Sequence, residues 1–243
     1  METSAIQIKQ ALFALADEQK REFLPYFFKT GEGQYGYGDK FIGVVVPKQR
    51  TLVKQYKTLE IADIEALLND EYHECRLTAL LFLVEKFKQA KNDISQQKII
   101  YDFYIAHYQH INNWDLVDLS APYIVGEFLL HKSAEELLQY AKSDNLWLQR
   151  ISIIATLRFI RANRFEKTFE LAKILLNHPH DLIHKAVGWT LREVGKKDYN
   201  AEYQFLTEEK RYQKMPRTML RYAIEKFPEN IRQDFLKSKI GYK

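Results

Sequence analysis

The chain has 243 residues, of which 46% are hydrophobic and 28% charged, and this composition excludes a disordered protein and predicts a sizeable core. One cysteine excludes a disulfide framework and a zinc site built on cysteines. The N-terminus lacks an apolar signal segment, and no apolar run approaches the roughly 20 residues of a membrane span. We therefore expect a cytoplasmic protein. Only nine glycines and six prolines favour helices over a β-rich fold.

The net charge of +4 is unevenly distributed along the chain. Residues 146–221 hold 15 Lys and Arg against 8 Asp and Glu, a balance of +7, while the rest of the chain balances at −3. This asymmetry indicates a surface for polyanions in the C-terminal half. The alternative is an ordinary solvated helix face.

The N-terminal part, residues 1–47, is expected to form helices followed by a Gly/Tyr-rich loop that holds five of the nine glycines. Gly31, Gly33 and Gly36 match GxGxxG, but a dinucleotide site needs a buried strand before this motif and a helix that opens at its last glycine. The chain has no parallel-sheet pattern, so we interpret the match as accidental. The loop either contacts a ligand or forms an ordered cap.

From residue 48 to residue 243, apolar residues recur at three- and four-residue steps, as in helices that bury one face. Leu77, Leu80 and Val84 illustrate this spacing. Short polar segments separate the helical runs, and one such break is expected at 195–198.

Cationic residues mark a repeat of helix pairs. A cation opens the second helix of a pair at Arg76, Arg150, Lys185 and Arg217, with separations of 74, 35 and 32 residues. Because 74 is about two periods of ~37 residues, a further repeat is expected to open near residue 113. This period predicts an all-α, HEAT-like or armadillo-like superhelix, a right-handed solenoid of helix pairs. The alternative is an irregular helical bundle.

The solenoid is expected to form a single repeat domain over residues 1–243. Motifs of other enzyme classes are absent from the sequence, among them GxSxG, the Walker A loop and HExxH. The pairs His107/His110 and His180/His184 could each share a helix face, but neither has a neighbouring Cys or a carboxylate at a spacing that favours a metal site, and we interpret them as exposed or capping histidines. We expect no metal and no cofactor.

Trp114 and Asp118 are four residues apart and so share one face of a helix. Trp189 lies on another second helix, between the cations Lys185 and Arg192. Second helices of a solenoid line one groove, where cations can neutralise phosphates and aromatic rings can stack on sugars or bases. The pattern favours nucleic acid binding. The alternative is that both tryptophans are core residues and that Asp118 caps a helix.

Several segments resemble the motifs of one family. Residues 113–118 (NWDLVD) look like the hallmark of the AlkD-type DNA alkylation repair family, and residues 185–193 (KAVGWTLRE) are similar to its second motif. Residues 147–150 and 216–225 resemble two further motifs, and the loop through Gly43 and Pro47 resembles an N-terminal element of many members. The resemblance spans nearly the whole chain.

The resemblance implies a HEAT-like-repeat DNA glycosylase that excises N3- and N7-alkylated purines from duplex DNA without flipping the base. It implies that Asp118 is the catalytic carboxylate and that Trp114 and Trp189 pack on the deoxyribose of the lesion. An alkylated purine is cationic, so its glycosidic bond breaks through an oxocarbenium-like sugar that a carboxylate stabilises. Indole rings over this sugar add roughly 0.5–2 kcal/mol.

The resemblance further implies that Arg150 binds the DNA backbone beside the catalytic carboxylate and that Arg192 holds a phosphate. Lys185 and Arg217 are also expected to bind DNA. Residues 181–182 (Asp-Leu) depart from the family pattern, in which some members have aromatic residues here. We expect a monofunctional enzyme that acts as a monomer on duplex DNA with alkylated bases, away from membranes. The alternatives are a non-catalytic HEAT-repeat protein that binds branched or damaged DNA and a scaffold for protein partners.

Overall fold

The computed structural model describes residues 4–56 and 59–240, and within these ranges it contains helices and no β-strand. The expectation of an all-α solenoid of helix pairs is confirmed. The chain divides into two compact units, Met1–Ser120 and Ala121–Lys243. None of the described helices is long and apolar enough to cross a membrane. That residues 1–243 form one domain stays a prediction.

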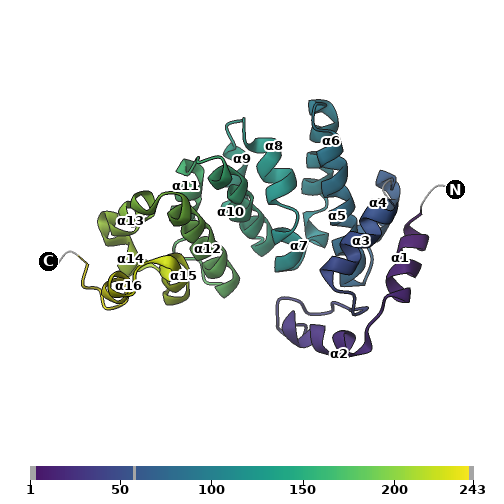
Figure 1. Ribbon diagram of the computed structural model, residues 1–243, viewed down its shortest axis with the longest axis horizontal. Coiled ribbons are helices and arrows are strands. Elements are labelled where there is room, and N and C mark those ends of the chain that lie inside the picture. Colours follow the sequence, from purple (N-terminus) through teal and green to yellow (C-terminus); the bar gives the residue numbers. More distant parts are fainter. Residues whose placement is uncertain (1–3, 57–58, 241–243) are drawn as a thin grey trace. The chain divides into compact units, whose positions relative to one another are not determined.

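The N-terminal unit is built around one long helix, α5 (Figure 1). This helix packs against α1, α3, α4, α6 and α7, and most of its residues are buried. Leu77, Leu80 and Val84 belong to this core, as their spacing predicts. The helices of the unit are α1 (Ala5–Ala14), α2 (Glu18–Phe27), α3 (Val46–Tyr56), α4 (Ile61–Leu68), α5 (His73–Gln89), α6 (Ile94–Ala106), the 3-10 turn η1 (Tyr108–His110) and α7 (Trp114–Asp118).

The Gly/Tyr-rich loop between α2 and α3 is bound to the start of α5. The buried carboxylate of Glu74 accepts hydrogen bonds from the backbone N–H groups of Ile42, Gly43 and Val44, at 2.9, 2.8 and 3.1 Å. Gly43 has a φ of +95°, and a Cβ at this position would clash with the carbonyl oxygen of Asp17. The loop is therefore an ordered part of the unit, and no strand precedes its GxGxxG match.

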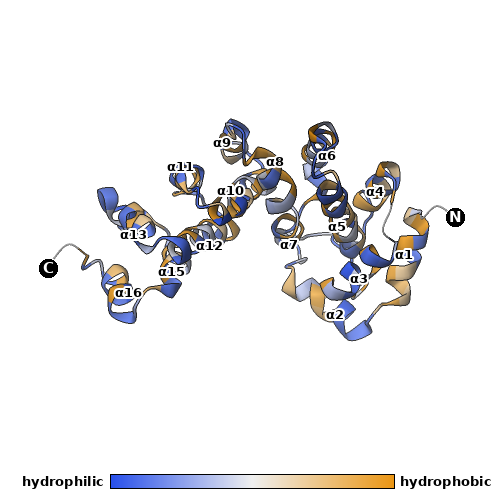
Figure 2. Cartoon of the chain, turned by 45° about the horizontal axis from the view of Figure 1, so that its top comes forward, coloured by the Kyte–Doolittle hydropathy of each residue, from blue (hydrophilic) through white to orange (hydrophobic). Residues whose placement is uncertain are grey.

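The C-terminal unit consists of helix pairs in two layers. Helices α10, α12 and α15 pack against one another in succession and form one layer. Helices α9, α11 and α13 form the second layer, which packs against one side of the first (Figure 1). Figure 2 shows hydrophobic and hydrophilic residues sharing most helices, as expected where each helix buries one side. The helices are η2 (a π-helix, Pro122–Gly126), α8 (Glu127–Leu129), α9 (Glu135–Ala141), α10 (Leu146–Arg161), α11 (Glu166–Ile174), α12 (Asp181–Lys197), α13 (Tyr199–Thr207), η3 (Glu208–Lys210), α14 (Arg211–Lys214), α15 (Arg217–Ala223), η4 (Ile224–Lys226) and α16 (Glu229–Leu236).

The break expected at 195–198 is shorter than predicted, because α12 continues through Gly195 to Lys197. Only Asp198 interrupts the helix, and its side chain caps α13 through the N–H of Ala201 at 3.0 Å. Gly195 serves packing instead of a turn. A Cβ at this position would clash with the buried carboxyl group of Glu202 on α13.

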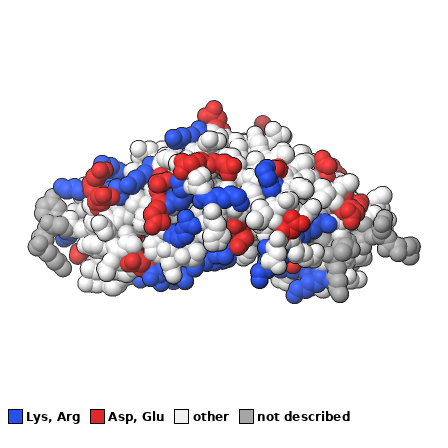
Figure 3. Space-filling view, turned by 90° about the horizontal axis from the view of Figure 1, so that it is seen from above, with Lys and Arg blue, Asp and Glu red and all other residues white. Residues whose placement is uncertain are grey.

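Seen from above, toward α9, α11 and α13, the surface carries basic and acidic side chains intermingled (Figure 3). Ion pairs on these helices include Lys167 with Glu135 at 3.0 Å and with Glu170 at 2.8 Å. On the described residues of this face, basic side chains therefore alternate with acidic ones and form no uniform basic patch.

Candidate functional site

Trp114 and Asp118 are the first and last residues of α7, so the helix carries both on one side. The side chain of Asn113 caps the helix by accepting a hydrogen bond from the N–H of Trp114 at 2.8 Å. Both Trp114 and Asp118 are half-buried. The sequence prediction that these two residues share a helix is confirmed, while their role in catalysis stays a prediction.

The Asp118 carboxylate lies near a buried hydroxyl pair. The phenol of Tyr104 and the hydroxyl of Ser120 are 2.8 Å apart. Burial raises the pKa of Tyr104 well above its ordinary value, the bond to Ser120 opposes this shift, and the negative charge of Asp118 adds to it. The charge of Asp118 therefore acts on this buried phenol.

Two aromatic rings at the end of α2 contact Trp114. Phe28 stacks on the indole, with ring centroids 5.3 Å apart and planes at 27°. Phe27 meets it edge-on at 5.7 Å and is itself 49% exposed. Trp114 is therefore fixed on one side and belongs to an aromatic surface that reaches solvent.

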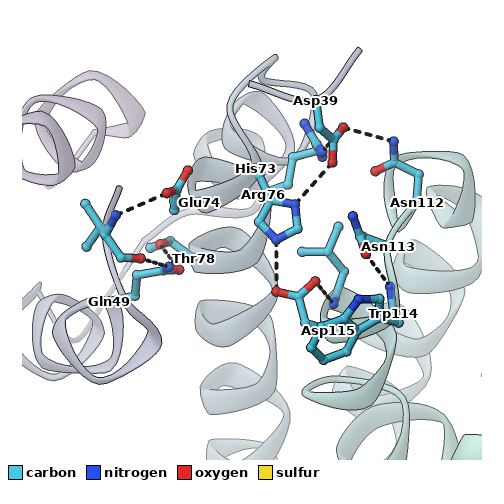
Figure 4. A network of polar contacts seen from close by, with 12 residues as sticks. Asp39, Gln49, His73, Glu74, Arg76, Thr78, Asn112, Asn113, Trp114 and Asp115 are labelled. Atoms are coloured by element: carbon cyan, nitrogen blue, oxygen red, sulfur yellow. Dashed lines mark hydrogen bonds and ion pairs between the residues drawn. The ribbon is translucent and has the colours of Figure 1, made fainter. Parts of the chain in front are cut away.

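A buried polar network lies behind α7 (Figure 4). Asp115 contacts His73 Nε2 through Oδ2 at 2.9 Å, and the other imidazole nitrogen, Nδ1, lies 3.2 Å from Asp39 Oδ2. Arg76 donates to the second oxygen of Asp39 at 2.6 Å, and Asn112 approaches that oxygen to 3.4 Å. The network joins the Gly/Tyr-rich loop, the start of α5 and α7.

The charges of this network shift the pKa values of its members. Burial disfavours a charged His73, but the carboxylates of Asp115 and Asp39 outweigh it and raise the pKa of His73 to about 9. Burial likewise opposes ionisation of Asp39, yet the hydrogen bond from His73 and the charge of Arg76 lower its pKa. At neutral pH, His73 is an imidazolium between two carboxylates.

In the C-terminal unit, Trp189 lies midway along α12, as predicted. Its indole Nε1 donates to Glu193 at 3.2 Å, and the ring lines a hollow of about 380 Å³. The floor of this hollow is apolar, from Leu157 and Ile160 of α10. Its other lining residues are Glu193 and the cations Arg161, Lys196 and Lys197.

The four cations predicted to bind DNA differ in their surroundings. Arg150 is 4% exposed and donates to the carbonyl oxygen of Leu182 at 2.6 Å. Lys185 pairs with Asp181 at 2.7 Å on the exposed side of α12. The remaining two are Arg192, paired with Glu225, and Arg217, which donates to the carbonyl of Leu236 at 2.7 Å.

Arg150 and Lys185 lie together at the N-terminal end of α12, next to His180. Burial lowers the pKa of His180, Asp181 opposes this shift, and His184, Arg150 and Lys185 add to it. Arg150 and Lys185 thus bring positive charge to this end of α12, where Asp181 pairs with Lys185. The sequence analysis did not identify Asp39, His73 and Phe28 as site residues, because they are far from residue 113 along the chain. Its only indication of this part of the site was the resemblance of the Gly/Tyr-rich loop to an element of the family.

Among the described residues, no group of three His, Cys, Asp or Glu could hold a metal.

The sequence profile of a family described as DNA alkylation repair enzyme matches residues 8–227. The chain belongs to this family. The resemblance seen in the motif around Trp114 is thereby confirmed at the level of the family, whose substrate is DNA. The fold is similar to that of a solved structure, a predicted DNA alkylation repair enzyme from Enterococcus faecalis. The two are 16% identical over 88% of this chain and 97% of the other, with a TM-score of 0.67. Among curated proteins, no sequence match is found.

Proposed function

We propose that this DNA alkylation repair protein is a monofunctional DNA glycosylase that releases N3- and N7-alkylated purines from duplex DNA. The observation that carries the proposal is α7, which presents an indole, Trp114, and a half-buried carboxylate, Asp118, on one side. Such a pair suits a cationic sugar, because the ring face and the carboxylate both attract positive charge.

In the proposed reaction, the bond between the sugar C1′ and the purine nitrogen breaks, and its electron pair leaves with the base. The alkylated purine is already cationic and departs neutral without a proton from the protein. Asp118 stabilises the positive charge that develops on the sugar and orients a water molecule. The water oxygen bonds to C1′ and its proton passes by way of the carboxylate to solvent. The products are the free base and an abasic site.

Further residues are assigned by resemblance and supported by their surroundings. Trp189 is the second indole proposed to pack on the lesion deoxyribose, and the cationic rim of its hollow supports a nearby phosphate. Arg150 and Lys185 supply positive charge at the N-terminal end of α12, where a helix attracts anions. Arg192 and Arg217 are proposed to bind phosphate. For Arg192, the pair with Glu225 must open first.

The test uses Asp118→Asn, which keeps the side-chain size and removes its charge. We expect methylated duplex DNA to lose 7-methylguanine and 3-methyladenine with the wild type and no free base with the variant, as measured by chromatography. Binding to undamaged duplex should stay within about twofold, because the change removes transition-state stabilisation alone. Asp102→Asn on the exposed side of α6 is the matched control and should retain full activity.

Wild-type excision by Asp118→Asn would overturn the assigned role. If the wild type binds duplex DNA and releases no base from it, the protein is instead a non-catalytic DNA-binding member.

A further inference from the structure

We propose that His73 is a positioning residue for α7: it holds Asp115 by a hydrogen bond and Trp114 through the ring of Phe28. The proposal rests on the proposed function of α7, because it assigns His73 the task of setting where Trp114 and Asp118 lie against DNA. His73 itself is 2% exposed and does not reach a substrate.

Helix α7 needs such an anchor because it has only five residues. Isolated helices shorter than about 12 residues are marginal in water, so contacts from outside must hold this one. Leu116 and Val117 are fully buried and fix its depth. They are apolar, however, and supply no directional contact to the helix.

Asp115 supplies the directional contact. One of its oxygens accepts the N–H of Leu116 at 2.9 Å, and the other lies 2.9 Å from His73 Nε2. The residue is 6% exposed. Both oxygens thus act inside the protein, and a shift of α7 would break a buried charge-assisted hydrogen bond.

The imidazole ring provides a second route to the same helix. It lies between Phe28 and Phe41, with ring centroids 4.7 and 4.8 Å away. Phe28 stacks in turn on Trp114. One residue of α5 therefore fixes the first residue of α7 by ring packing and the second by a hydrogen bond.

The charged groups that face His73 are Asp39 from the loop, Arg76 from α5 and Asp115 from α7. Only the protonated imidazole can donate to both carboxylates at once. Loss of the proton leaves Asp39 or Asp115 without this donor inside the protein. The position of α7 should therefore respond to the protonation of His73.

The experiment compares Asp39→Asn and His73→Gln with the control Asp102→Asn, using single-turnover excision from methylated duplex. Asp39→Asn keeps the size of the side chain and the contact of His73 to Asp115, but it also removes the charge that Arg76 faces. His73→Gln leaves the Asp39–Arg76 pair intact and is therefore the second variant. We expect excision to slow by about 10- to 100-fold, because small misplacements of reacting groups cost that much. Binding to undamaged duplex should change by less than about twofold.

The pH profile separates positioning from mere support of the fold. The wild-type rate should fall above about pH 9, where His73 loses its proton. In Asp39→Asn this fall should begin at lower pH, because one of the two carboxylates that hold the proton is gone. Any titration of the DNA substrate affects the pH profiles of the wild type and the variants equally, so a difference between the profiles comes from the protein. An unchanged rate and an unmoved alkaline fall in Asp39→Asn would overturn the proposal.

A measurement that does not depend on catalysis distinguishes the positioning proposal from the glycosylase proposal. The indole N–H signal of Trp114, identified by its loss in Trp114→Phe, should titrate in NMR spectra with His73 and shift to lower pH in Asp39→Asn. If the wild type excises no base but this titration occurs, the glycosylase proposal fails and the anchoring of α7 stands. If excision occurs and the indole signal does not titrate with His73, the positioning proposal fails and the glycosylase proposal stands.

Discussion

Two aspartates on α7 occupy different environments although they are only three positions apart. Asp115 is 6% exposed and both of its oxygens bind within the protein. Asp118 is half-buried and lies close to the phenol of Tyr104. The carboxylate of Asp115 thus binds α7 to the rest of the unit, and the carboxylate of Asp118 is partly exposed to solvent.

Glu202 is a buried acid that the proposed reaction does not use. Burial raises its pKa to about 9, although the charge of Arg192 opposes the shift, and its Oε1 has no hydrogen-bond partner among the described residues. Because the folded pKa exceeds the ordinary 4.5, the contribution of Glu202 to stability is full below pH 4.5 and is lost as pH rises toward 9.

We therefore predict that Glu202→Gln leaves the free energy of unfolding nearly unchanged at pH 4.5 and raises it at pH 8 by on the order of 5 kcal/mol. Urea denaturation at both pH values measures the difference. Glu166→Gln on the exposed side of α11 is the control and should show no such pH-dependent gain. A variant that is less stable than the wild type at pH 8 would show that Glu202 is ionised in the fold.

At the scale of elements, the loop before α3 is held chiefly by one side chain of α5. Glu74 accepts three backbone N–H groups and is 1% exposed. The same loop carries Asp39, which contacts His73 and Arg76. The loop and the start of α5 are therefore joined by polar contacts. His73 at this junction packs on Phe28, and Phe28 stacks on Trp114, so the aromatic surface is connected to the junction.

Glu74→Gln should detach the loop, because an amide has one acceptor oxygen where the carboxylate has two. Hydrogen bonds to charged groups contribute about 1.5–3 kcal/mol each, so we expect a loss of about 2–4 kcal/mol in the free energy of unfolding. Proteolysis within residues 29–45 should accelerate. The same substitution at Glu85 on α5, which pairs with exposed Lys88, should cost less than about 1 kcal/mol. Equal losses at the two sites would contradict the assigned role.

On the scale of the whole molecule, the basic excess of residues 146–221 is partly neutralised by folding. Lys185 pairs with Asp181, Lys196 with Glu193, and Arg192 with Glu225. Arg150 is buried. Fewer cations are therefore available to DNA phosphates than the sequence balance of +7 indicates.

Lys197 lines the Trp189 hollow and forms no ion pair among the described residues. If it contacts a phosphate, Lys197→Gln should lower the slope of log binding constant against log salt concentration by about 0.9. Fluorescence anisotropy on undamaged duplex measures the slope. Lys98→Gln, which removes a cation paired with Asp102 on α6, should leave it unchanged. Identical slopes for the wild type and Lys197→Gln would exclude this contact.

The sequence by itself determined the helical fold, the helix that carries Trp114 and Asp118, and the family. Helical periodicity and short motifs are local, and residues four apart meet on one face whatever the rest of the chain does. The same local reasoning placed Trp189 midway along α12. It failed at Gly195, where packing against Glu202 and not a turn explains the glycine.

Only the tertiary structure decided what surrounds these residues. Asp39, His73 and Asp115 are distant in sequence, and their contacts exist because the loop, α5 and α7 pack together. Likewise, the neutralisation of Arg192 by Glu225 depends on the packing of α12 against the segment after α15. Charge and burial are properties of the space around a side chain, so the sequence supplied the candidate residues and the fold assigned their environments.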